Sequence, residues 1–183
     1  KIDIILVTAL FLLAFGIRSI PSDKFPNIYG FDSYWAARMT KYAITGEHDF
    51  NFSISTGFAG FTDIATDYPY GRSDATPGEG GWWFLNIVAY KLFGGGGPFS
   101  YNQFGAIASW MVAIVGSLAI PAIYLFGRAA FNRNVGLSAA LFLTGTGNHL
   151  FYSIFGHAEN DALGLCLFFI CAFLFVMTIK RRS

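Results

Sequence analysis

The stretch IDIILVTALFLLAFGIRSI, residues 2–20, is an almost uninterrupted apolar segment near the start of the chain. A helix needs about 20 mainly apolar residues to cross the hydrocarbon core of a bilayer. The apolar part of a signal peptide is shorter, about 7–15 residues, and ends at a small-residue cleavage site. No clear site of that kind follows here, so we interpret the segment as a membrane anchor.

Three later segments share this apolar character, and the four together predict the fold class. The spans are expected at residues 2–20, 104–130, 135–152 and 162–179. The third is the weakest because TGTGNH, residues 144–149, interrupts it, and Pro121 is expected to kink the second. Only 13% of the 183 residues are charged, against about 25% in a typical soluble domain. The sequence therefore predicts an all-α, polytopic membrane protein with about four spans.

The charged residues predict how the spans are oriented. Basic residues lie before the first span, around the turn between the second and third, and after the fourth: Lys1, Arg128, Arg133, Lys180, Arg181 and Arg182. If the spans alternate, all of these fall on one side, which the positive-inside rule makes cytoplasmic. Ten of the 11 acidic residues, all but Asp3, then lie on the other side, in the long loop over residues 21–103 or just before the fourth span.

The long outer loop is expected to contain two short helices. Residues 33–45 form an amphipathic pattern, with Asp32 as the expected N-cap and Gly46 as the stop signal. Residues 82–93 form the second, ended by four glycines, and residues 50–66 are expected to be irregular. Aromatic residues make up 19% of the chain. We expect Trp82 and Trp83 to anchor the loop at the membrane interface, where such side chains are favoured.

Composition excludes several other kinds of protein. The two cysteines, Cys166 and Cys171, lie in an apolar segment and indicate neither a disulfide framework nor a zinc site. A formal net charge of +1 gives no indication of nucleic-acid binding.

Three carboxylates are predicted to gather at the outer face. Asp32 follows the first span, while Glu159 and Asp161 precede the fourth. Each has a plainer interpretation as a helix cap or as a charge that complements a helix dipole. In a helix Glu159 and Asp161 would point about 200° apart, so joint binding requires a non-helical turn. Three hard oxygen donors suit Mg²⁺ or Mn²⁺ and not zinc, so we expect them to approach within reach of one cation.

Three other side chains are candidates for substrate binding. Arg38 lies further along the first loop helix and could face a lipid phosphate, Arg72 ends the turn YPYGR, and His157 adjoins the acidic pair. Each again has a plainer alternative: a snorkelling arginine, a solvated loop arginine and a packed histidine.

The residues resemble a known family at three places. GFDSYWAARMT, residues 30–40, resembles the first acidic motif of the oligosaccharyltransferase catalytic subunit, in which Asp–x–Tyr is followed by an Arg at the spacing of Asp32 to Arg38. DYPYGR, residues 67–72, resembles its Trp/Tyr–Pro–x–Gly–Arg stretch, and GHAEND, residues 156–161, its second acidic motif. The match is closest to the archaeal and eukaryotic branches, with an archaeal source favoured. It implies the amino-terminal part of a membrane glycosyltransferase of the GT-C type.

The resemblance also implies a reaction. The family transfers an oligosaccharide from a polyprenyl (dolichyl) phosphate or pyrophosphate to the asparagine of Asn–x–Ser/Thr in an acceptor polypeptide. By this resemblance Asp32 binds the metal and engages the acceptor amide as a catalytic residue, Glu159 is a metal ligand, and Asp161 is a metal ligand or orients the metal. The cation, Mn²⁺ or Mg²⁺, would stabilise charge on the departing phosphate oxygen. Membrane lipids are further expected partners, and the catalytic face is expected outside the cytoplasm.

The chain departs from the family pattern in several respects. Glu159 stands where the family usually has Asp, and Tyr152 stands near the place of a family Arg. A third acidic group and a soluble carboxy-terminal domain with a Trp-Trp-Asp motif are missing from this stretch, so the fragment alone is expected to be inactive. Two alternatives stay open: another lipid-linked sugar transferase, such as a protein O-mannosyltransferase, and a non-enzymatic transporter or scaffold subunit. The acidic pair before the fourth span favours the first interpretation.

Overall fold

A computed structural model describes residues 2–23, 27–46, 51–53, 57–59, 62–63, 72–73 and 80–182 of the chain. Its helices are α1 (Ile2–Ser19), the 3₁₀ helix η1 (Ile20–Asp23), α2 (Phe31–Thr45), α3 (Gly80–Phe93), α4 (Tyr101–Ala130), α5 (Arg133–Gly145), α6 (Gly147–Phe151) and α7 (Asp161–Arg182). Four very short strands form two antiparallel pairs, β1 (Asn51–Ser53) with β2 (Gly57–Ala59) and β3 (Thr62–Asp63) with β4 (Arg72–Ser73). The predicted all-α, polytopic fold class is confirmed, with these strands as small additions in the outer loop.

Three helices in the described part of the chain are long and apolar enough to cross a membrane: Ile2–Asp23, Tyr101–Ala130 and Asp161–Arg181. The segment expected as the third span instead forms two helices. The first of them, α5, has 13 residues, and at 1.5 Å per residue it covers about 20 Å of the roughly 30 Å hydrocarbon core. The break falls at Thr146, whose extended backbone separates α5 from α6 between two glycines. Pro121 lies inside α4, which continues to Ala130.

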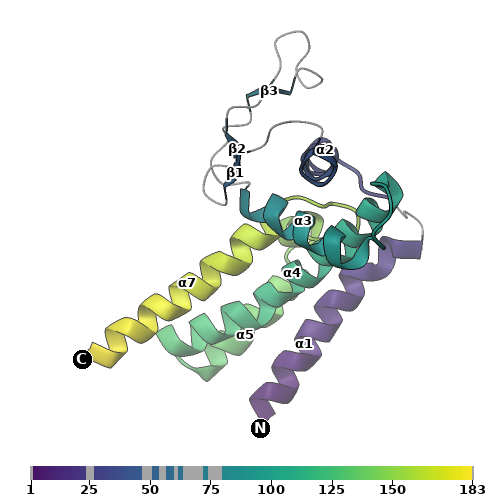
Figure 1. The fold of residues 1–183 in the computed structure, drawn as a ribbon. Coiled ribbons are helices and arrows are strands. Elements are labelled where there is room, and N and C mark those ends of the chain that lie inside the picture. Colours follow the sequence, from purple (N-terminus) through teal and green to yellow (C-terminus); the bar gives the residue numbers. More distant parts are fainter. Residues whose placement is uncertain are drawn as a thin grey trace.

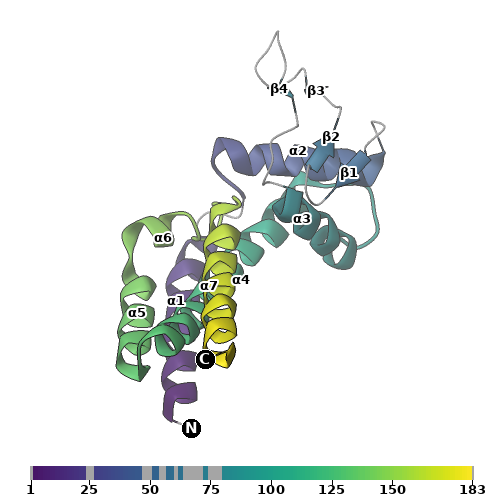
Figure 2. The ribbon, with the colours of Figure 1, turned by 90° about the vertical axis from the view of Figure 1, so that its left-hand side faces the viewer.

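The long helices form a bundle with both termini at one end. In Figure 1 α1, α4, α5 and α7 run beside one another, the N- and C-termini lie at the lower end, and α2, α3 and the strands lie at the other. Figure 2 shows α2 running across the direction of the long helices. The helix α4 packs against α1, α5 and α7. Gly127 and Gly136 allow α4 and α5 to meet, since a Cβ atom on Gly127 would lie 2.9 Å from Cα of Gly136.

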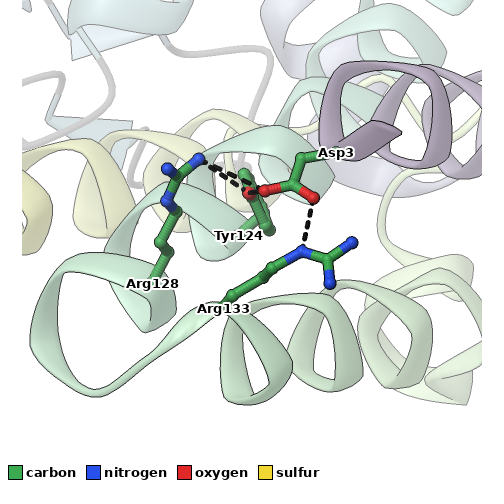
Figure 3. A network of polar contacts seen from close by, with 4 residues as sticks. All are labelled: Asp3, Tyr124, Arg128 and Arg133. Carbon is green, nitrogen blue, oxygen red and sulfur yellow. Dashed lines mark hydrogen bonds and ion pairs between the residues drawn. The ribbon is translucent and has the colours of Figure 1, made fainter. Parts of the chain in front are cut away.

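A polar network ties the start of α1 to the α4–α5 turn (Figure 3). The Tyr124 hydroxyl donates a hydrogen bond to Oδ2 of Asp3 over 2.9 Å, and Nε of Arg133 donates to Oδ1 of Asp3 over 2.5 Å. Nη1 of Arg128 lies 3.0 Å from the Tyr124 hydroxyl and 3.4 Å from Oδ2 of Asp3. The first turn of α1 and the α4–α5 turn therefore share one end of the bundle, as the charge pattern predicts; the assignment of that end to the cytoplasm stays a prediction.

We expect the Asp3→Asn substitution to lower the midpoint of thermal unfolding of the full-length protein by a few degrees. Arg128 and Arg133 would lose their anionic partner and would keep two like charges near each other. The difference from the unsubstituted protein should shrink at high salt because both arginine side chains are exposed. Thermal unfolding in detergent at two salt concentrations measures it. Asp23→Asn, at the opposite end of the first span, is the matched control, and equal midpoints for the two variants would contradict the expectation.

The outer helices confirm part of the sequence interpretation. Gly46 ends α2 in the left-handed conformation, with its N–H donating to the Tyr42 carbonyl over 3.0 Å, as predicted. The predicted second helix is α3, which ends where the run of glycines begins. Much of residues 50–66 lies outside the described residues, and the described parts form short strands instead of the irregular chain that was expected.

Two predictions for these helices are wrong. The N-cap of α2 is Gly30, with φ of 89° and no side-chain cap bond, and Asp32 lies inside the first turn. The chain turns at Gly30 because glycine tolerates this backbone conformation, so the helix begins before the carboxylate. Trp82 and Trp83 are only 2% and 1% exposed, so they are core residues and not membrane-interface anchors. They pack in a cluster formed by α2, α3, α4 and the start of α7, with Trp35, Met39, Tyr90, Phe104, Val112, Ala158 and Ala162.

Candidate active site

The two acidic stretches lie side by side at the end of the bundle where α2 and α3 pack. The Tyr29 N–H donates to the Gly156 carbonyl over 2.8 Å. The indole Nε1–H of Trp82 donates to the Ala158 carbonyl over 3.1 Å. The segment that leads into α2 is thus bonded to the segment that leads into α7, and α3 holds the second of them from another direction.

Two glycines permit this close approach. Gly156 has φ of 97°, and a Cβ atom there would lie 2.8 Å from ring carbons of Tyr29 and 3.3 Å from the Asn27 carbonyl oxygen. A Cβ atom on Gly30 would lie 3.0 Å from Oε1 of Glu159. The Glu159 carboxylate therefore sits against the first turn of α2, where the partial positive charge of a helix N-terminus favours an anion.

Asp32 and Glu159 line one small cavity. It has a volume of about 20 Å³ and is also lined by Ala36, Trp82, Trp83 and Asn160. A cavity of this size holds about one water-sized particle. Two acidic residues predicted to act together, one from α2 and one from the turn before α7, therefore line the same space.

Asp161 opens onto a different space. As the first residue of α7, it lines a cavity of about 590 Å³ between α5–α6 and α7, and Asn160 lines both cavities. Among the residues that the structure describes, no three His, Cys, Asp or Glu side chains gather closely enough to hold a metal ion. Asp32 and Glu159 thus line one cavity and Asp161 lines the neighbouring one. The expected approach of the three carboxylates within reach of one cation stays a prediction.

His157 is buried and directed at Glu159. Its Nε2 lies 2.9 Å from Oε2 of Glu159, a distance that forms an ion pair when the imidazole is protonated. The rings of Tyr29, Phe151 and Tyr152 surround it, with centroids 4.8–5.3 Å away. Burial, and after it the charge of Glu159, raises the pKa of the Tyr29 phenol. The imidazole therefore lies against one oxygen of Glu159, although neither of its ring nitrogens makes a hydrogen bond, while the other oxygen lies near Gly30 at the start of α2. A role for His157 in substrate binding stays a prediction.

The comparisons with known proteins decide the family. Residues 5–183 match the family described as oligosaccharyl transferase STT3, N-terminal. The chain belongs to the STT3 oligosaccharyl transferase family. This confirms the resemblance that the acidic motifs carry.

Two relatives show how much of an STT3 protein the chain represents. It is 28% identical to the dolichyl-diphosphooligosaccharide–protein glycosyltransferase subunit STT3A of rice over an alignment of 183 residues. This alignment covers 94% of this chain and 21% of the rice protein. Its fold matches the crystal structure of the Archaeoglobus fulgidus oligosaccharyltransferase in the apo form with a TM-score of 0.73 at 18% identity, over 98% of this chain and 20% of that one. The chain therefore spans about a fifth of the length of either relative.

The two arginines of the STT3 motifs, Arg38 and Arg72, are placed by their helix or strand. Arg38 is partly buried on α2, in the same helix as Asp32. Arg72 lies in β4, opposite Asp63 of β3, and residues 67–71 of its motif are outside the described part of the chain. Their proposed contacts with substrate stay predictions.

Sequence reasoning missed three residues of this site. Trp82 holds the second acidic stretch through its indole, Asn160 lines both cavities, and Tyr29 bonds the backbone of Gly156. Tryptophan in an outer loop of a membrane protein favours an interface position, and a backbone hydrogen bond leaves no trace in residue types.

Proposed function

We propose that this chain is the amino-terminal membrane part of an enzyme that transfers an oligosaccharide from a polyprenyl (dolichyl) phosphate or pyrophosphate to the asparagine of Asn–x–Ser/Thr. The supporting observation is the single cavity shared by Asp32 and Glu159, which come from the two acidic motifs of the STT3 pattern. The rest of the protein would supply the remaining acidic group and the domain that reads the sequon. Membership of the STT3 family supports the reaction class.

A hard divalent cation, Mn²⁺ or Mg²⁺, fits the residues present. Asp32 and Glu159 provide two carboxylates and Asn160 an amide, around a space of about 20 Å³. Mg²⁺ in proteins commonly keeps several waters and is held by one or two carboxylates together with substrate phosphate oxygens. Asp32 and Glu159 would hold the ion, and Asp161 would complete or orient the site from the adjoining cavity. When bound, the ion supplies Lewis-acid stabilisation of charge on the donor phosphate.

The protein's own side chains would bind the acceptor amide and orient the acidic residues. An amide nitrogen is a poor nucleophile because its lone pair is delocalised into the carbonyl. The Asp32 carboxylate, at an exposed position in the first turn of α2, would accept a hydrogen bond from the acceptor amide and reduce that delocalisation. His157 would hold Glu159 in the orientation seen here.

The position of the site suits a lipid-linked donor. It lies where the first span ends and where α7 begins, so a polyprenyl tail could remain in the bilayer while its phosphate reaches the acidic cavity. The distribution of Lys and Arg supports a catalytic face outside the cytoplasm. An archaeal cell membrane is the proposed setting.

The direct test is oligosaccharide transfer by membranes that carry the full-length protein. A lipid-linked oligosaccharide donor and an Asn–x–Thr peptide are supplied with Mn²⁺, with Mg²⁺, or with chelator. We expect transfer with a divalent cation, loss of transfer with chelator, and recovery when the cation is restored. A peptide with Gln in place of the acceptor Asn should remain unmodified, and it serves as the matched control.

Other outcomes would favour the alternatives. Transfer to the hydroxyl of a Ser/Thr peptide, with no transfer to Asn, would point to an enzyme of the O-mannosyltransferase kind. The absence of transfer to either peptide, with a donor that a known oligosaccharyltransferase uses, would contradict the proposed activity.

A further inference from the structure

Arg18 is a charged residue buried completely within the protein. It lies near the end of α1 and has an exposed fraction of 0%. Ionisable residues at membrane depth are costly, and they are kept where their hydrogen bonds serve a purpose. The Nε–H of Arg18 donates to Oγ of Ser153 over 2.7 Å, and Nη1 donates to the Ala14 carbonyl over 3.1 Å. The partner of its side chain outside α1 is therefore the segment that links α6 to the second acidic stretch.

The backbone of Arg18 holds the same segment. Its carbonyl accepts a hydrogen bond from the Phe155 N–H over 2.9 Å. Phe155 is 3% exposed, and its ring packs edge-on against Trp110 of α4 at a centroid distance of 5.1 Å. Side chain and backbone of one residue of α1 thus bind Ser153 and Phe155, two residues apart in the link.

The helix α4 is shaped to allow this contact. A Cβ atom on Gly116 would overlap Ser153 and would lie 3.3 Å from Nε of Arg18, so only glycine fits at that point of α4. The Gly116 carbonyl also lies 2.9 Å from Nε2 of His149 in α6, the helix that precedes the link. Ser153 in turn donates to the His149 carbonyl. The helices α4 and α6 and the link therefore meet beside Arg18.

The link leads directly into the acidic site. Gly156, the residue after Phe155, accepts the hydrogen bond from Tyr29, and Glu159 follows three residues later. Tyr29 belongs to the segment that connects α1 to Asp32. The link is therefore continuous with the short stretch that places Glu159 at the cavity it shares with Asp32.

We infer that Arg18 is a positioning residue, which fixes the second acidic stretch against α1 and so sets Glu159 opposite Asp32. As far as cation binding and transfer are concerned, this inference rests on the proposed function. The placement of the link is a structural matter that can be measured independently of any activity.

The test uses the full-length protein with Arg18→Gln, Arg18→Lys and Ser153→Ala. Hydrogen–deuterium exchange reports the backbone of residues 153–160, and electron paramagnetic resonance reports Mn²⁺ binding with the metal alone.

In Arg18→Gln we expect faster exchange in that segment and unchanged exchange in α4. Groups that orient metal ligands typically contribute about 10- to 100-fold in metal affinity, and we expect a weakening of Mn²⁺ binding in that range, with lower kcat. Arg18→Lys should be intermediate because an ammonium lacks the forked donors of a guanidinium.

Ser153→Ala keeps the inference testable if Arg18→Gln does not fold, since it keeps Arg18 and removes the acceptor of the Nε bond together with the bond from Ser153 to the His149 carbonyl. It should show the same changes to a smaller degree. Arg181→Gln, at the exposed end of α7, is the matched control and should resemble the unsubstituted protein. Unchanged exchange and unchanged Mn²⁺ binding in folded Arg18→Gln and Ser153→Ala would overturn the inference. Faster exchange in the variants together with no transfer by the unsubstituted protein would support the positioning role and contradict the proposed function instead.

Discussion

Replacing Asp32 by Asn is expected to abolish most oligosaccharide transfer by the full-length protein. Asparagine keeps the size of the side chain but removes the negative charge that faces the cavity shared with Glu159. Loss of one group that stabilises charge in a reaction typically lowers kcat by about 10²- to 10³-fold. Because Asp32 is proposed both to hold the cation and to engage the acceptor amide, we expect an effect at the upper end of that range. Initial rates with saturating peptide and Mn²⁺ measure it.

The control for this substitution is Asp23→Asn. Asp23 is an exposed carboxylate of η1, in the loop region before α2, and does not line the cavity. Its substitution should leave the rate of transfer within a factor of two, by the usual small effect of exposed surface changes. Undiminished transfer in Asp32→Asn would contradict a catalytic role for Asp32. Its carboxylate would then serve only to complement the dipole of α2, which is the plainer interpretation of its position.

Replacing Gly156 by Ala is expected to separate the two acidic stretches. The backbone there has φ of 97°, and a Cβ atom would lie 2.8 Å from the Tyr29 ring. A left-handed backbone costs an L-residue about 1–2 kcal/mol, and overpacking of a tight site adds about 1–3 kcal/mol. The Tyr29–Gly156 bond should lengthen or break, which would lower both the thermal stability and the rate of transfer. Thermal unfolding and transfer are measured on the same preparations.

Substitutions at two other glycines serve as controls that distinguish backbone strain from steric crowding. Gly96 has φ of 71° and no atom within 4 Å of a built Cβ, so Gly96→Ala introduces backbone strain alone. Gly145 has neither a positive φ nor a neighbour, so Gly145→Ala introduces neither. We expect Gly156→Ala to lose transfer, Gly96→Ala to lose some stability only, and Gly145→Ala to change little. Equal transfer in Gly156→Ala and Gly96→Ala would show that contact between the stretches is not required.

The parts of the fold that sequence predicted correctly depend on local composition. Long apolar runs identify α1, α4 and α7 because a helix that crosses a membrane must satisfy its backbone internally and present apolar side chains. The end of α2 at Gly46 follows from the freedom of glycine to adopt a left-handed conformation. The placement of both acidic stretches at one end follows from the alternation of spans, and the bonds from Tyr29 and Trp82 confirm it.

The incorrect or incomplete predictions involve choices between local alternatives. Asp32 is a good N-cap by type, but the turn at Gly30 begins the helix before it. The segment over residues 135–152 has enough apolar residues for a span, yet the glycines around Thr146 divide it into α5 and α6. Trp82 suits both a membrane interface and a protein core, and the partners that bury it come from distant parts of the chain.

The sequence by itself determined that this is a membrane protein of the STT3 type, which side of the bundle carries its acids, and which residue types are available there. Those properties depend on hydropathy, on charge distribution and on short motifs, all of which are local. Only the tertiary structure decided that Asp32 and Glu159 line one cavity while Asp161 lines the next, and that Arg18 bonds the link between α6 and the second acidic stretch. These depend on contacts between residues far apart in the chain, because the backbone path at Gly30, Gly116 and Gly156 sets which side chains can approach.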